Sequence, residues 1–436
     1  MFNNSNNTLM NSTANAQTDN QNYKMLSVEI EKYFKVTTQT NATLLRKIYI
    51  HTQLCSALRP WEHLYPGDCL RIVGSTLNGF GHEGSDLDLC IILPETTISR
   101  KKTLEHLEEL KDIFVALPMV SSSVVRKGKV SILHMTLNPP FDHITVDLNV
   151  NNIVTQTNTY MLWQYSTIDW RARALFSIVK TWAKNRGFND SRNQGFNSYS
   201  LLLLVIHYLQ YGVYPAVLPS LQRIYKNYDR PVVWYIFNKD SLAELLIGFF
   251  KYYTEVFDFD RDAISVRAGR RLSREAVVRR TKHKSQWQYV CIEEPFLLNN
   301  TAHSVYSERV FAGIKKELSE SFSDIREECQ LWKLLGIPHE TYVDLFKNKT
   351  IPLTLKRLDG VVDFVKIHLL TDYSNEVPLY DFPRVIFTFS SDLLWVIPTV
   401  STIHITFADR KKTRRKGIPK FLDLLKTSTE DDEASS

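Results

Sequence analysis

The sequence predicts an α+β fold in which a mixed sheet with helices precedes a mainly helical domain. Residues 59–158 alternate short apolar runs of strand length with a segment of helical periodicity. From residue 159 onward the apolar positions recur with helical spacing, and the segment 200–211 is apolar on all sides, as in a buried helix. At 436 residues the chain has room for two or three domains of ordinary size.

The first 58 residues predict a tail and a helical segment. Residues 1–22 are rich in Asn, Thr and Ser and have neither the apolar core of a signal peptide nor the basic amphipathic helix of a transit peptide. We expect them to form a disordered polar tail. Residues 23–58 have apolar positions at helical spacing, and we expect this helical segment to pack with the central domain.

Three further regions follow along the chain. In residues 59–158, "CLRIVGS", "LDLCIIL" and "HITVDLNV" have the composition of buried strands, and "SRKKTLEHLEELKDIFVAL" predicts an amphipathic helix. Residues 159–330 predict a helical central domain. Residues 331–436 combine apolar strand-like runs, a basic run and an acidic tail, and we assign them no role.

Composition and charge narrow the class of protein. The net charge of +6 permits a polyanionic partner without demonstrating one. The five cysteines are widely spaced and contain no CxxC pair, which argues against a disulfide framework or a zinc site. The most hydrophobic stretch, 385–407, contains Asp392 and Pro398, so we expect buried strands there, no membrane span and a soluble intracellular protein.

The segment "RIVGSTLNGFGHEGSDLDLCIIL" carries the most informative residues. A strand leads into Gly74-Ser75, a glycine-rich loop follows, and the next strand opens with Asp86 and Asp88. Residues i and i+2 of a strand point to one face, with Cα atoms about 6–7 Å apart, and Asp147 lies in a later strand between apolar neighbours. A lone Asp-X-Asp is usually a solvated turn, but three converging carboxylates repel each other unless a cation binds. The pattern favours a Mg²⁺ site for phosphoryl transfer.

"GSTLNGFGHEGSDLDL" together with Asp147 resembles the nucleotidyltransferase superfamily related to DNA polymerase β. More narrowly, the chain resembles the non-canonical cytoplasmic poly(A) polymerases and terminal uridylyltransferases, especially those of the germline-development type. The resemblance covers residues 40–330 and includes "VDLNVNN", "VKTWAKNRGFND", "GFNSYSLLLLVIHYLQ" and "VCIEEPFLLNNTA". It implies a polymerase β-like catalytic domain, a helical poly(A) polymerase-associated domain and a nucleotide cleft between them.

The resemblance also implies roles for individual residues. Asp86, Asp88 and Asp147 would hold two Mg²⁺ (or Mn²⁺) ions and carry the catalysis. The nucleotide-binding residues would be Gly74, Ser75, Asn152, Thr159, Lys180, Lys184, Ser198, Tyr199, Glu294 and Asn300. The two lysines would contact the triphosphate, although a solvated pair also explains two lysines four residues apart on a helix. Tyr199 would stack on the base, unless it is an ordinary core aromatic residue.

The loop "EEPFLLNNTAH" bears on the choice of base. Uridine-specific members of the family carry a His after "EDPF", whereas this loop has Asn299 and Asn300 and no matching His. Glu294 can accept a hydrogen bond from the exocyclic amine of adenine. We therefore expect ATP as the substrate, although Leu297 replaces the acidic residue that is usual after "PF".

A basic segment predicts contact with RNA. "RDAISVRAGRRLSREAVVRRTKHK" holds nine Lys or Arg residues against two acids, and either a solvated loop or a rim for the RNA backbone explains it. The candidate RNA-binding residues are Arg270, Arg271, Arg279 and Arg280. We find no dedicated sequence reader in the chain, so we expect a separate RNA-binding protein to recruit or activate it, with no DNA or membrane as partner. The basic run 410–416 fits a nuclear-localisation patch as well as RNA binding, so we expect a cytoplasmic protein with the nucleus as an alternative.

These observations predict template-independent addition of AMP from ATP to an RNA 3′ end. The 3′-hydroxyl, deprotonated with help from Asp147 and one ion, would attack the α-phosphate, while the ion held by Asp86 and Asp88 neutralises the leaving pyrophosphate. A uridylyltransferase using UTP is the alternative within this class. A catalytically inactive scaffold or RNA-binding subunit is the alternative from another class.

Overall fold

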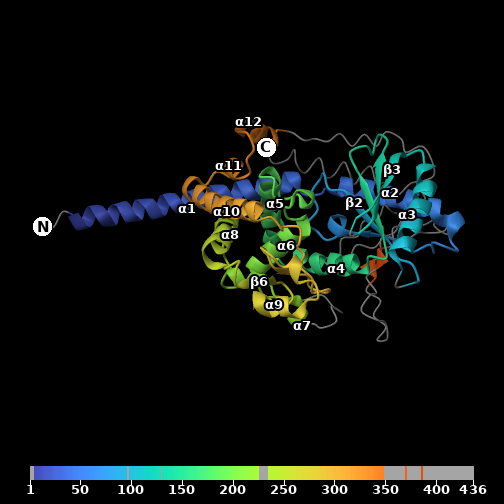
Figure 1. Ribbon diagram of the computed structural model, residues 1–436. Coiled ribbons are helices and arrows are strands. Elements are labelled where there is room, and N and C mark those ends of the chain that lie inside the picture. The colour runs from blue at the N-terminus through green and yellow to red at the C-terminus, as the bar shows by residue number, and fades with distance from the viewer. Residues whose placement is uncertain are drawn as a thin grey trace. The chain divides into compact units, whose positions relative to one another are not determined.

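The computed structural model describes residues 4–95, 98–128, 130–224 and 234–347, with side chains from residue 20 onward (Figure 1). It also places two short strands, β9 (Leu369–Leu370) and β10 (Arg384–Val385), which pair antiparallel. The chain divides into two compact units. We call residues 39–77 and 84–160 the sheet unit, and residues 4–38, 78–83 and 161–347 the helical unit.

The sheet unit contains a five-stranded mixed sheet in the order β1-β2-β5-β4-β3. Its strands are β1 (Leu70–Val73), β2 (Leu87–Ile91), β3 (Val120–Arg126), β4 (Ile132–Leu137) and β5 (Val146–Val150). Strands β2 and β5 run parallel, and every other neighbouring pair is antiparallel. The three strands predicted from "CLRIVGS", "LDLCIIL" and "HITVDLNV" are therefore present as β1, β2 and β5.

Two helices cover one face of this sheet. They are α2 (Asn41–Leu58) and α3 (Arg100–Val115), capped by the side chains of Thr40 and Ser99. Leu54 of α2 and Phe114 of α3 pack in one core with Leu87, Leu89 and Leu148. Since side chains alternate along a strand, the residues between these leucines point to the opposite face of the sheet. Asp88 and Asp147 occupy such positions.

The helical unit holds the remaining long helices. They are α1 (Asn4–Thr37), α5 (Trp170–Asn185), α6 (Ser198–His207), α8 (Leu242–Lys251) and α10 (Glu308–Glu328), with the shorter α7 (Leu221–Ile224), α9 (Arg274–Arg280), α11 (Leu331–Leu334) and α12 (His339–Asp344). Helix α4 (Ile153–Ile168) carries the chain from the sheet unit into the helical unit. Every residue of α6 from Ser200 to His207 is buried, as its all-apolar sequence predicts. The predicted α+β class is confirmed.

A three-stranded sheet in the helical unit was not predicted. It has the order β7-β6-β8, formed by β6 (Asp262–Ser265), β7 (Arg270–Ser273) and β8 (Ile292–Glu293). The strands are two to four residues long, and β7 begins with two arginines. Runs this short and this charged have no periodicity by which a strand could be recognised.

The ends of the chain differ from the sequence-based expectation. Helix α1 begins at Asn4, where we expected a disordered tail to residue 22. From residue 20 onward, where side chains are described, its first buried position is Leu26. Packing from Leu26 onward nucleates the helix, and adding further turns toward the N-terminus then costs little free energy. The segment 23–58, predicted as one helical segment, is divided between the two units: α1 belongs to the helical unit and α2 to the sheet unit. The helical unit continues beyond residue 330 through α12, whose Tyr342 stacks on Tyr33 of α1.

Some expectations lie outside the described residues. These are the basic run 410–416, the acidic tail, and the buried strands of 385–407 except for residue 385. Among the helices that the structure describes, none is both long enough and apolar enough to span a bilayer.

Candidate active site

Strands β2 and β5 bring two of the predicted carboxylates side by side. Asp88 and Asp147 are register partners in this parallel pair, so their side chains leave the sheet on the same face, on strands about 4.8 Å apart. Asp86 lies two residues before Asp88, and the N–H of Leu87 donates to the carbonyl of Thr145 at 2.8 Å. The ladder between β2 and β5 therefore extends to the position of Asp86.

Polar neighbours orient these acids. The Thr145 hydroxyl donates to Asp86 Oδ1, and the Nζ of Lys47, a fully buried residue of α2, donates to the Asp86 carbonyl at 3.3 Å. On the next strand, His134 is the register partner of Asp147, and its Nδ1 lies 2.6 Å from Asp147 Oδ1. Neither Lys47 nor His134 was predicted. Their only signal in the sequence is a polar residue within an otherwise apolar segment.

The predicted carboxylates supply oxygen donors for a metal ion. Within the described ranges, no three His, Cys, Asp or Glu side chains are gathered closely enough to hold an ion as they stand. Carboxylates are nevertheless the hard oxygen ligands that Mg²⁺ prefers, and Asp88 and Asp147 are already neighbours. The residues present fit a divalent hard cation rather than a thiolate-bound metal.

The Gly74-Ser75 turn packs directly on Asp88. Gly74 has φ +70°, and a Cβ built there would lie 2.5 Å from Asp88 Oδ2. Its N–H donates to Thr159 Oγ1 at 2.8 Å, and the Thr159 hydroxyl donates to the Thr155 carbonyl at 2.7 Å. Thr159, which we predicted to contact the nucleotide, is 6% exposed and holds this turn in place instead. Ser75 lies within the turn, and Asn152 directly precedes α4.

Helix α5 carries the two predicted lysines. Lys180 is half-buried and Lys184 exposed, while Trp182 and Ala183 between them are buried. Both lysines act on His82, whose pKa falls to about 3 mainly through burial and further through their positive charges. His82 belongs to Asn78–Glu83, the part of the glycine-rich loop that lies in the helical unit.

Two hydrogen bonds and one aromatic contact fix this loop against α5 and α1. Arg173 Nε donates to the Gly79 carbonyl at 2.8 Å, and the Glu83 N–H donates to the Thr37 carbonyl at 2.9 Å. Phe80 packs edge-on against Phe176 with ring centroids 5.6 Å apart. The segment that joins the Gly-Ser turn to Asp86 is thus held on the helix that carries both lysines.

The start of α6 and the "EEPF" loop are joined by Glu294. Tyr199 donates through its hydroxyl to Glu294 Oε1 at 3.2 Å, and Glu294 Oε2 accepts from the N–H groups of Phe296, at 2.8 Å, and Leu297. Glu294 is 5% exposed. Its carboxylate closes the loop and orients Tyr199, which is a different task from the predicted reading of adenine. Ser198 shares a 3.3 Å hydrogen bond with Asn189.

Asn300 is a structural residue. Its Oδ1 accepts from the N–H groups of Ile292 and Ala302, both at 3.0 Å, and its Nδ2 donates to the carbonyls of Gln286 and Val290, both at 2.8 Å. An amide side chain makes two donations and two acceptances, so all four are used. At 1% exposed, Asn300 has nothing left with which to contact a nucleotide, contrary to its predicted role.

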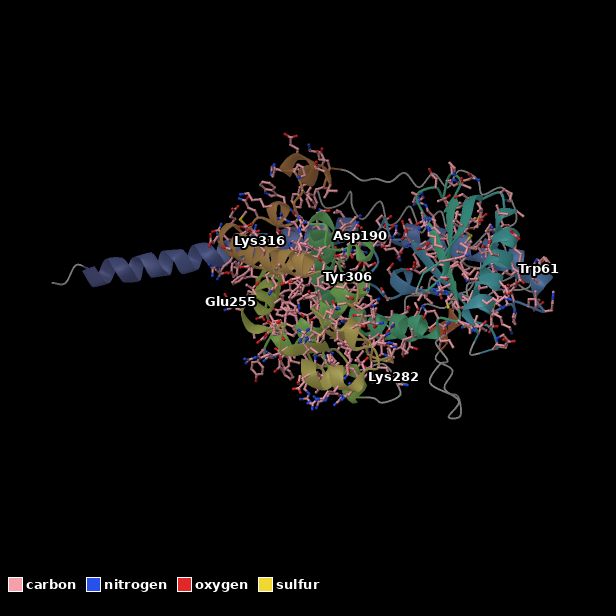
Figure 2. The ribbon with its side chains drawn as sticks, in the orientation of Figure 1. Trp61, Asp190, Glu255, Lys282, Tyr306 and Lys316 are labelled. Atoms are coloured by element: carbon pink, nitrogen blue, oxygen red, sulfur yellow. The ribbon has the colours of Figure 1, made fainter. Side chains whose placement is uncertain are left out.

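The four arginines predicted to bind RNA differ in their surroundings. Arg271 donates through Nη1 to Asp262 at 2.8 Å and to the Val256 carbonyl at 3.2 Å, so it joins β7 to β6. Arg279 pairs loosely with Glu275 at 3.5 Å on the exposed face of α9. Arg270 and Arg280 are exposed. Lys282, which follows α9, marks this basic segment in Figure 2.

Comparison with known proteins gives the chain its family. Residues 26–167 match the family model described as "Poly(A) RNA polymerase, mitochondrial-like, central palm domain", and residues 241–300 match "Cid1 family poly A polymerase". Poly(A) RNA polymerase gld-2 of Caenorhabditis elegans is 37% identical over 382 residues, which cover 71% of this chain and 33% of the relative. The chain thus spans a third of the length of that relative.

Solved structures agree with the family models. A structure described as "structure of GLD-2/RNP-8 complex" has 40% sequence identity and a TM-score of 0.63, with 72% of this chain and 98% of that chain covered. A Cid1 poly(U) polymerase structure with MgGTP bound shares the fold, with 20% identity, a TM-score of 0.62 and coverage of 72% and 100%. The resemblance seen in the sequence is confirmed. The chain belongs to the family of non-canonical poly(A) RNA polymerases of the GLD2 type.

Proposed function

We propose that this chain adds AMP from ATP to the 3′ end of RNA without a template. The observation that carries the proposal is the pairing of Asp88 and Asp147 on adjacent parallel strands, with the Gly74-Ser75 turn packed on Asp88. Carboxylates beside a glycine-containing turn suit the binding of a metal-bound triphosphate. Membership of a family whose relatives are named poly(A) RNA polymerases supports the same reaction.

Asp86, Asp88 and Asp147 would hold two Mg²⁺ or Mn²⁺ ions. When bound, such ions neutralise phosphate charge and favour the ionised form of a hydroxyl. The chain's own contribution is to fix the acids: Lys47 and Thr145 hold Asp86, and His134 orients Asp147. Rigidly held acids lose little entropy when the reactants bind.

Groups of the helical unit would bind the nucleotide. Lys180 and Lys184 would contact the triphosphate, Ser198 a phosphate at the N-terminus of α6, and Tyr199 the base. Glu294 keeps the Tyr199 ring in place through its 3.2 Å hydrogen bond. Asn152, at the start of α4 in the sheet unit, would contact the ribose 2′-hydroxyl.

The preference for ATP rests on the loop after "EEPF". Glu294 and Asn300 are occupied by the loop's own hydrogen bonds, so neither directly reads the base. The lack of a matching His at Asn299 and Asn300 and the poly(A) relatives support ATP. We also propose that the chain works in the cytoplasm, with the nucleus as an alternative. A separate RNA-binding protein would recruit or activate it. The solved complex of GLD-2 with RNP-8 supports the need for a partner protein.

Extension of a labelled 15-nucleotide RNA by the purified chain with Mg²⁺ tests the proposal, with each of the four NTPs supplied separately. A ladder with ATP alone is expected. A ladder with UTP instead would make the chain a uridylyltransferase. If no nucleotide is incorporated, and tethering the protein to a reporter RNA in cells also yields no tail, the inactive scaffold is the better description.

A further inference from the structure

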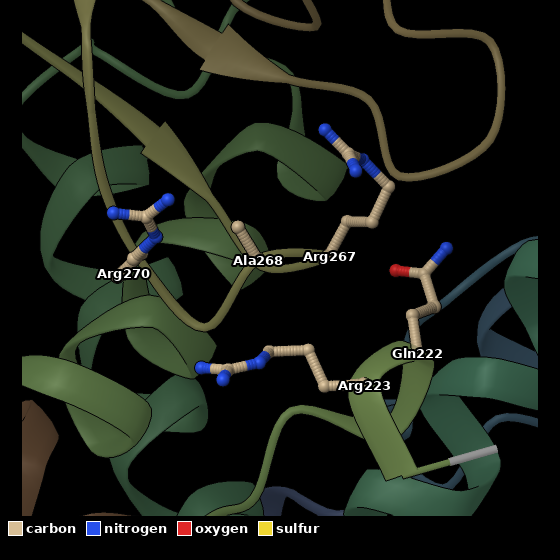
Figure 3. A pocket seen from close by; sticks show the side chains of 5 residues that line it. All are labelled: Gln222, Arg223, Arg267, Ala268 and Arg270. Carbon is tan, nitrogen blue, oxygen red and sulfur yellow. The ribbon is translucent and has the colours of Figure 1, made fainter. Parts of the chain in front are cut away.

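A pocket of about 660 Å³ in the helical unit is lined by three arginines (Figure 3). Helix α7 supplies Gln222 and Arg223, the turn after β6 supplies Arg267 and Ala268, and Arg270 begins β7. No acidic residue is among these five lining residues. The pocket is separate from the lysines of α5 and was not predicted as a unit, because its arginines are up to 47 residues apart in sequence.

The positive charge of the pocket is only partly neutralised. Arg267 forms a bidentate pair with Glu293, with Nη2 2.8 Å from Oε1 and Nε 3.2 Å from Oε2, and Glu293 is 3% exposed. Arg223 and Arg270 are exposed, and neither has an ion-pair partner within the described part of the chain. Two guanidinium groups therefore remain for an anion.

The backbone of the pocket is fixed before any ligand binds. Gly269 has φ +60°, and a Cβ there would lie 2.6 Å from the Cβ of Ser220. The Ser220 hydroxyl donates to the Arg267 carbonyl at 2.8 Å, and the Ala268 N–H donates to Ser265 Oγ at 3.0 Å. The turn that carries Arg267 and Arg270 is thus held against the start of α7. A preformed site loses less entropy on binding than a flexible one.

Two contacts join the pocket to the segment that orients Tyr199. Gln222 Nε2 donates to the Pro295 carbonyl at 2.9 Å, and Arg267 holds Glu293. Glu294, between these two residues, binds the Tyr199 hydroxyl. An anion in the pocket therefore binds beside the backbone of Glu293–Pro295, which also supports the predicted base site.

Guanidinium groups bind phosphate oxygens through paired N–H donors, and exposed arginines suit a polyanion that continues beyond the pocket. We propose that Arg223 and Arg270 bind a backbone phosphate of the RNA acceptor strand. This inference rests on the proposed function, because it assigns the substrate of that reaction a second contact. The phosphates of free ATP are the other source of the same chemistry.

Binding of a labelled single-stranded 15-nucleotide RNA to the full chain, without nucleotide and at several salt concentrations, tests the inference. The Arg223→Ala/Arg270→Ala variant should bind about tenfold more weakly, and the slope of log K against log salt should decrease by about 0.7 for each phosphate that the variant no longer neutralises. The matched control Arg309→Ala/Arg326→Ala removes the same charge from exposed positions of α10 and should bind as the wild type does.

Three outcomes would overturn the inference. If the wild type binds RNA and the double variant has the same affinity and salt slope, only the pocket is wrong and the proposed function stands. If the variant keeps its RNA affinity but its KM for ATP rises, the pocket holds nucleotide phosphates instead. If the wild type does not bind RNA at all, the pocket is wrong, and the extension and tethering assays decide separately whether the proposed function stands.

Discussion

Gly74 packs against the carboxylate of Asp88 so closely that a Cβ at Gly74 would lie 2.5 Å from Asp88 Oδ2. The contact joins the end of β1 to β2, and Val73 and Asp88 are register partners in the same ladder. With φ +70°, Gly74 also has a backbone conformation that side-chain-bearing residues rarely adopt. The position of the turn proposed to bind phosphate and that of a proposed metal ligand therefore depend on each other.

Replacing Gly74 by Ala should disturb both the turn and Asp88. The new Cβ must displace Asp88 or the turn, so we expect the free energy of unfolding to fall by about 1–3 kcal/mol and nucleotide incorporation to be strongly reduced. Urea unfolding and RNA extension measure the two effects. Gly84→Ala is the control, because a Cβ there meets nothing within 4 Å. Equal behaviour of the two variants would contradict the importance of the Gly74–Asp88 contact.

Asn300→Ala separates a structural residue from a base-reading one. The substitution leaves the buried N–H groups of Ile292 and Ala302 and two carbonyls without their partner, so we expect a loss of about 2–4 kcal/mol in the free energy of unfolding. Asn299→Ala, in the same loop, should change it by less than about 0.5 kcal/mol. Unchanged stability of Asn300→Ala together with a raised KM for ATP would restore the nucleotide-binding role.

His134 should act through Asp147. Without the 2.6 Å contact the Asp147 carboxylate can rotate, so we expect His134→Ala to lower kcat by about 10–100-fold while the KM for ATP changes little. His134→Asn, which keeps a donor on the side chain, should recover part of the loss. His143→Ala is a control at an exposed position before β5. An unchanged kcat for His134→Ala would show that the contact has no role in the reaction.

The buried His51 and His207 and the half-buried His82 make the folded chain sensitive to acid. Burial lowers the pKa of His207 and His82 to about 3 and that of His51 to about 4, from an ordinary 6.5. The unfolded chain takes up these protons below pH 6.5 and the folded chain does not, so the stability is complete above pH 6.5 and is lost as the pH falls toward 4.

Urea unfolding between pH 7 and pH 5 measures this loss. Below pH 6.5 each histidine should contribute up to about 1.4 kcal/mol per pH unit. His207→Phe keeps an aromatic ring among Tyr211, Tyr252 and Phe257 and should reduce the dependence by about one proton. The same pH dependence in this variant and the wild type would contradict the assignment to His207.

Period and composition are sufficient to predict the strands that carry the acids. Asp86 and Asp88 alternate with Leu87 and Leu89 as in a half-buried strand, so β2 and the shared face of the two acids follow from the sequence. The side chains that contact those acids cannot be predicted from the sequence. His134 meets Asp147 only because β4 pairs with β5 in one register, and no local pattern determines which strands pair.

The proposed nucleotide site shows a second limit of prediction from the sequence. A resemblance transfers residue identities, but it does not show which hydrogen bonds those residues already make. Thr159 and Asn300 are among the predicted nucleotide-binding residues, yet their polar atoms are used within the fold. Arg223 and Arg267 form one pocket through the tertiary packing of Ser220 on Gly269, which sequence spacing does not reveal.

The most direct test of the central claim compares three aspartates in incorporation of labelled AMP into RNA. Asp88→Asn and Asp147→Asn retain the size of the side chain but lose the charge that an ion requires, whereas Asp142→Asn removes the same charge at an exposed position before β5. The proposed site predicts that the first two variants lose at least about 10²-fold in kcat and that the third keeps wild-type activity. Wild-type incorporation by Asp88→Asn or Asp147→Asn would contradict it.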